Sequence, residues 1–89
     1  MPLEQTDHHK ESLDKARNFR QSGDMKDGLS ALSRILKDDA DNDEALYMAA
    51  VCHRYLNDFG AALEAIGALK KVKPGYGRAY QEEGHVRLA

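Results

Sequence analysis

The chain has 89 residues, with 13 lysines and arginines against 15 aspartates and glutamates. This length bounds the chain to one small domain, and its near-neutral charge argues against the basic surface that nucleic acids or anionic membranes attract. Its apolar runs are only a few residues long, so no transmembrane helix is expected.

Composition favours an all-helical fold. The chain has two prolines and no tryptophan, and it is rich in alanine, leucine, lysine, glutamate and aspartate. The sequence shows no sustained alternation of polar residues with valine, isoleucine or threonine, which would indicate strands.

The first half of the chain predicts two helices. One is expected over about residues 4–21, with Leu13, Ala16 and Phe19 on one face, and the next over about 25–37, with apolar residues at steps of three and four. Between them, Gly23 suits a left-handed residue beyond a helix end, and Asp24 can cap the second helix.

The second half predicts three more helices. One is expected over about 43–56, where Asp41 and Glu44 have the spacing of a capping box. Another is expected over about 59–72, ended by Pro74 and Gly75, and a last one over about 76–89.

The helix pairs recur at an offset of 34 residues. Ala16 falls on Ala50 and then on Gly84, each 34 positions later, and Phe19 falls on His53. In the same way Gly28 falls on Ala62, Leu32 on Ile66, and Ile35 on Leu69. Because slim residues let antiparallel helices approach closely, we expect Ala50 and Ala62 to lie at a helix crossing.

The recurring pattern of bulky, small and aromatic positions, with a turn and a closing proline, resembles the tetratricopeptide repeat family. The resemblance implies an all-α fold of antiparallel helix hairpins stacked in a right-handed superhelix of about five helices. It divides the chain into a flexible lead-in (1–8), a first repeat (9–42), a second repeat (43–76), and a truncated third repeat or capping helix (77–89). The packing positions that it implies are Ala16, Phe19, Gly28, Leu32, Ala50, His53, Phe59, Ala62, Ile66, Pro74 and Gly84.

The same resemblance implies a non-catalytic scaffold that holds a peptide or protein segment in a concave groove. The groove residues that it implies are Leu13, Asp14, Arg17, Arg20, Gln21, Tyr47, Met48, Val51, Arg54, Tyr55, Arg78, Gln81, Glu82 and His85. Two interpretations of Arg20 and Arg54 stay open: they contact the partner, or they only solvate a helix end. The clamp with which some similar proteins bind a chaperone's terminal carboxylate lacks its amides here, so a chaperone tail is not the expected ligand.

Two and a half repeats are close to the minimum of about three for a stable array. An alternative is therefore the N-terminal or oligomerisation segment of a larger enzyme, for example one with a sulfotransferase-like domain. A homo-oligomer that covers Tyr80, Val86 and Leu88 on the last helix is a further expectation.

Catalytic, metal and DNA-binding sites are not expected. His8 and His9 are adjacent, as are Cys52 and His53, so the members of each pair point to different faces of a helix. His53 is expected as a packed core residue, and the three lysines in 69–73 suit a helix C-terminus. We expect no cofactor, no metal, no nucleic acid and no membrane partner.

The cytoplasm is the expected compartment. The sequence MPLEQTDHHKES lacks a basic segment followed by an apolar one, so no signal peptide is expected. The single cysteine, Cys52, fits a reducing compartment.

Overall fold

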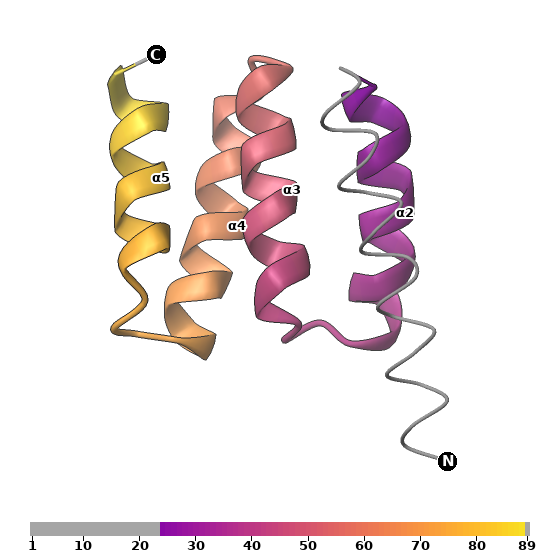
Figure 1. The fold of residues 1–89 in the computed structure, drawn as a ribbon, viewed down its shortest axis with the longest axis horizontal. Helices are drawn as coiled ribbons and strands as arrows, with labels where there is room; N and C mark the ends of the chain where they lie inside the picture. Colours follow the sequence, from indigo (N-terminus) through magenta and orange to yellow (C-terminus); the bar gives the residue numbers. More distant parts are fainter. Residues whose placement is uncertain (1–23, 89) are drawn as a thin grey trace.

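The computed structural model describes residues 24–88, which form four α-helices: α2 (Met25–Asp38), α3 (Asp43–Tyr55), α4 (Phe59–Val72) and α5 (Gly77–Leu88). Successive helices run in opposite directions and lie side by side (Figure 1). No strand occurs within residues 24–88, so the prediction of an all-α fold is confirmed. Every helix end that was predicted in this range lies within one residue of its place in the structure, and the helix expected over 4–21 lies outside the described residues.

The 34-residue period is visible in the backbone. Helices α2 and α4 each have 14 residues and begin 34 positions apart. The turns that follow them repeat the same hydrogen bonds: the Asp39 amide donates to the Ile35 carbonyl at 2.8 Å, and the Lys73 amide donates to the Leu69 carbonyl at 2.8 Å. Equivalent sequence positions therefore adopt equivalent turns, as a helical repeat requires.

Helix α3 is the centre of the described structure, because it packs against α2, α4 and α5. One of its sides faces α2 through Ala45, Met48, Ala49 and Cys52. Met48 and Ala49 each lie three or four positions from both Ala45 and Cys52, so the four residues share one side of the helix. They are buried in a cluster whose α2 members are Met25, Leu32 and Ile35.

A different side of α3 packs between α4 and α5. Ala50 and Ala62 have no exposed surface, and they lie in one cluster with Ile66 and Val86. A neighbouring cluster joins Leu46 of α3, Leu69 of α4 and Ala79 of α5. The residues of one helix pair thus reach the next helix along the chain, which stacks the helices into a continuous core.

The helix starts differ from prediction in one detail. Helix α3 is capped by Asn42, whose Oδ1 accepts a hydrogen bond from the Ala45 amide at 2.9 Å. The predicted capping box on Asp41 is therefore wrong by one position, because the chain enters the helix at Asn42. Asp24 does occupy the N-cap position of α2, but its side chain makes no capping hydrogen bond.

The end of α3 is a Schellman motif, which satisfies two of its last carbonyl groups. Asn57 has a φ of 62°, in the left-handed region. Its amide donates to the Arg54 carbonyl at 3.0 Å, and the Asp58 amide donates to the His53 carbonyl at 2.8 Å. Asparagine is one of the few residues besides glycine that adopts this conformation readily, and it fixes the reversal that sets α4 against α3.

Candidate protein-binding surface

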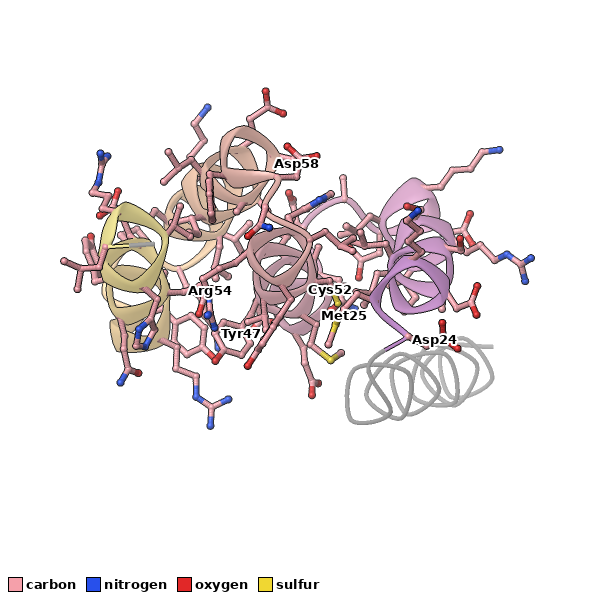
Figure 2. The ribbon with its side chains drawn as sticks, turned by 90° about the horizontal axis from the view of Figure 1, so that it is seen from above. Asp24, Met25, Tyr47, Cys52, Arg54 and Asp58 are labelled. Carbon is pink, nitrogen blue, oxygen red and sulfur yellow. The ribbon has the colours of Figure 1, made fainter. Side chains whose placement is uncertain are left out.

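The described groove candidates lie on the adjacent helices α3 and α5, which we call the α3–α5 face. Figure 2 shows Tyr47 and Arg54 on the α5 side of α3, whereas Cys52 and Met25 lie between α3 and α2. On α5, Arg78, Gln81 and His85 are exposed, and on α3 Tyr55 is 58% exposed. We define the α3–α5 face by its solvent-accessible members: Tyr47, Arg54, Tyr55, Arg78, Gln81 and His85.

At one end of this face, two neighbouring aromatic rings lie between two cations. The rings of Tyr47 and Tyr76 meet edge to face, with their centroids 6.5 Å apart. The guanidinium of Arg78 lies 5.5 Å from the centroid of the Tyr47 ring, and the ammonium of Lys73 lies 5.0 Å from that of Tyr76. Each cation is thereby held against the electron-rich face of a ring, so the cluster is ordered before any partner arrives.

A salt bridge at the base of α4 braces the same cluster. The Lys73 ammonium lies 2.7 Å from an Asp43 carboxylate oxygen at the start of α3. This hydrogen bond lowers the pKa of the Asp43 carboxyl, and the same contact raises the pKa of Lys73. Asp43 therefore balances the charge of Lys73, and the same ammonium lies over the ring of Tyr76, which meets Tyr47.

Arg54 and Glu82 form the second ion pair of the face, and it joins α3 to α5. Arg54 Nε donates to Glu82 Oε2 at 2.5 Å, and Nη2 donates to Oε1 at 3.4 Å. Glu82 is only 2% exposed, and Arg54 compensates the burial of its carboxylate. The Glu82 carboxylate raises the pKa of the Arg54 guanidinium, which also lies 4.8 Å from the centroid of the Tyr55 ring.

Three groove predictions need correction. Met48 is 3% exposed and belongs to the α2–α3 cluster, because it shares a stripe with Ala45 and Cys52. Val51 is 4% exposed, and Glu82 is buried in its pair with Arg54. None of the three offers an open side chain to a partner in this structure.

Arg54 matches neither of its two predicted roles in full. It does not simply solvate the end of α3, since its guanidinium neutralises Glu82 across the helix interface. It retains some exposed surface beside Tyr55, with 24% of its side chain accessible. Arg54 is thus first a positioning residue, which fixes the spacing of the two helices that carry the face.

Tyr76, Lys73 and Asp43 lie beside the α3–α5 face and are linked to it through Tyr47, but the sequence did not predict them as groove residues. Lys73 and Tyr76 lie in the turn between α4 and α5; the sequence predicted Lys73 at a helix C-terminus and Tyr76 at the start of the last helix, and gave neither a place in the groove. The sequence feature that could have indicated this contact is the presence of a tyrosine near each end of the second repeat, Tyr47 and Tyr76. Their meeting depends on how α3 and α5 pack.

The predicted packing positions differ in how deeply they are buried. Gly28, Leu32, Ala50, Ala62 and Ile66 are buried, and Phe59 packs against the Ala50 cluster while partly exposed. Pro74 is exposed in the turn before α5. At Gly84, an added Cβ would meet nothing within 4 Å, so the described residues give this glycine no close contact.

His53 does not occupy the core, which corrects the prediction of a packed histidine. Its side chain is partly exposed, and Nδ1 lies 3.9 Å from an Asp58 carboxylate oxygen. The reason is its place in the last turn of α3, where the chain turns away toward α4.

The surface predicted for self-association is smaller than expected. Val86 is buried against Ala50 and Ala62 instead of facing outward. Tyr80 is half-exposed and donates a hydrogen bond to the Pro74 carbonyl at 2.8 Å, and Lys70 lies over its ring. Leu88 remains available for the predicted self-association, since it is 89% exposed.

Several predictions fall outside the described residues. They concern the groove positions Arg17 and Arg20, the packing positions Ala16 and Phe19, and the further groove residues Leu13, Asp14 and Gln21. Within residues 24–88, no cluster of three or more histidine, cysteine or acidic side chains could hold a metal ion, and no helix is long and apolar enough to cross a membrane.

Comparison with known protein families gives one match. A family model described as a tetratricopeptide repeat matches residues 19–83, which include most of the described helices. No curated protein matches the chain.

Proposed function

Because the chain belongs to the tetratricopeptide repeat family, whose members generally mediate protein–protein interactions, we propose that it binds a peptide or protein segment on the α3–α5 face. In this proposal residues 43–76 act as one repeat, and α5 begins the next. The cytoplasm remains the proposed compartment, on the cysteine count alone.

The observation that carries the proposal is the kind of side chain that the α3–α5 face exposes. Tyrosine and arginine are enriched among residues that dominate binding energies. Tyr55 is 58% exposed, so packing in the core does not explain a large aromatic residue at this position. Tyr47 lies between Arg78 and Tyr76. A surface that is aromatic, ordered and braced by the Arg54–Glu82 pair can bind a segment at little cost in side-chain entropy.

Selection from a displayed library of random 12-residue peptides on the immobilised full chain tests the proposal. The enriched peptides, remade synthetically with a fluorophore, should bind in fluorescence anisotropy. Amide chemical-shift changes on binding should concentrate in α3 and α5 and spare the outer side of α2.

Tyr55→Ala should weaken the binding of these peptides about tenfold, the loss expected for an aromatic contact residue. Tyr80→Ala is the matched control, because Tyr80 has similar exposure but lies on the α4 side of α5. If no peptide is enriched, or if the two variants bind alike, the α3–α5 face is not the binding surface.

A further inference from the structure

A stripe of exposed residues runs the length of α5 on the side turned away from α4. Arg78, Gln81, His85 and Leu88 recur at steps of three and four, and all four are exposed. The opposite side of α5 faces α4, since Glu83 forms a salt bridge with Lys70 at 2.8 Å and Ala79 packs with Leu69. This stripe continues the α3–α5 face along α5.

Three cations lie on or beside the α3–α5 face, and among the described residues Arg78 is the one without a carboxylate partner. Arg54 is paired with Glu82 at 2.5 Å, and Lys73 is paired with Asp43 at 2.7 Å. Arg78 makes no ion pair with any residue from 24 to 88, and its guanidinium lies over the Tyr47 ring, 5.5 Å from the centroid. A guanidinium carries five N–H donors in a planar fork, which can bind a carboxylate with two hydrogen bonds.

Two large apolar side chains are exposed at the other end of the surface. Leu88 is 89% exposed and Tyr55 is 58% exposed, and each lies at the C-terminal end of its helix. Figure 1 shows α3 and α5 running in the same direction, so these two ends lie at the same end of the molecule. Arg78, near the start of α5, and the two exposed apolar residues are therefore at opposite ends of the surface.

The helix sets the distance between the two groups. Leu88 follows Arg78 by ten positions, which corresponds to about 15 Å along the helix axis. Resting on the peptide-binding function proposed above, we propose that the bound segment is acidic at one end, with an Asp or Glu side chain on Arg78 and a large apolar side chain on Leu88. An extended peptide advances about 3.3 Å per residue, so the two ligand residues stand about four or five positions apart.

The peptide selection described above tests this inference when every random segment is flanked by invariant residues, so that only side-chain carboxylates are available. The enriched sequences should pair Asp or Glu with Leu, Ile, Phe or Met at that spacing. Replacing the acidic residue by its amide in a synthetic, C-terminally amidated peptide should weaken binding about tenfold.

Charge reversal gives the sharper result. Selection on the Arg78→Glu variant should enrich Lys or Arg in place of the acidic residue, whereas Arg34→Glu on α2 should leave the acidic preference unchanged. Leu88→Ser should remove the preference for the apolar residue and keep the acidic one. Circular dichroism of each variant checks that the helices are intact.

Other outcomes overturn the inference. Enriched peptides that need Tyr55 but show no acidic residue would leave the peptide-binding function standing and remove the role of Arg78. Peptides that bind only with a free C-terminal carboxylate would assign the anion to a chain terminus instead of a side chain. Failure of any peptide to bind would remove the proposed function together with the inference.

Discussion

At the scale of single residues, the least expected feature is the Glu82 carboxylate, which is buried between two helices. Burying a charge is costly unless a partner compensates it, and Arg54 is that partner, with two hydrogen bonds. The sequence placed both residues on an open groove. Their pairing shows that a polar residue at a groove position can serve the spacing of the helices instead of the ligand.

Arg54→Ala should therefore destabilise the fold, because it leaves the Glu82 carboxylate buried and unpaired. We expect a loss of about 2–4 kcal/mol in the free energy of unfolding, since Arg54 itself is partly exposed. Urea unfolding followed by circular dichroism measures this loss. The double variant Arg54→Met with Glu82→Leu should recover most of it, and equal losses in the single and double variants would show that the burial of the charge is not the cause.

At the scale of the helices, start and end signals are local, and this is why the bounds were predictable. A helix begins where a short polar side chain can accept the first free amides, and it ends where the backbone must turn to the left. The turn before α3 ends with two neighbouring residues, Asp41 and Asn42, whose short polar side chains could each serve as the cap. Only the backbone path selects Asn42.

Asn42→Ala should cost about 1 kcal/mol of stability, because the Ala45 amide loses its acceptor. For a domain of this size that corresponds to a fall in Tm of about 4–8 °C. Asp41→Ala is the matched control and should change Tm by less than half as much. A larger effect at Asp41 than at Asn42 would restore the capping box that the sequence suggested.

At the scale of the whole molecule, the fold is a stack in which each helix is covered by its neighbours along the chain. Helix α3 touches all three other described helices, and α4 touches α3 and α5. The small residues Ala50 and Ala62 allow α3 and α4 to lie close together, and they share a buried cluster with Ile66 of α4 and Val86 of α5. The position of α5, and with it half of the proposed binding surface, depends on this crossing.

Ala62→Leu should destabilise the stack by about 1–3 kcal/mol, since there is no free surface into which the larger side chain could move. It should also weaken peptide binding to the α3–α5 face by displacing α5. Gly67→Ala on the same helix is the control: a Cβ there meets nothing within 4 Å, and alanine favours the helix by up to about 1 kcal/mol. Thermal unfolding separates the two, and an unchanged Tm in Ala62→Leu would contradict a close crossing.

The amino-acid sequence by itself determined the helix number and bounds over residues 24–88, the 34-residue period and the family, because periodicity, caps and turn residues act over a few positions. It also placed Tyr55, Arg78, Gln81 and His85 where the structure leaves them exposed. Only the tertiary structure decided that Met48 turns into the core and that Arg54 meets Glu82, 28 positions away. The same is true of Tyr47 and Tyr76, whose contact depends on how the helices around the turn are packed. The physical reason is that a helical pattern tells which residues share a stripe, whereas the contacts between helices decide whether that stripe meets a neighbour or water.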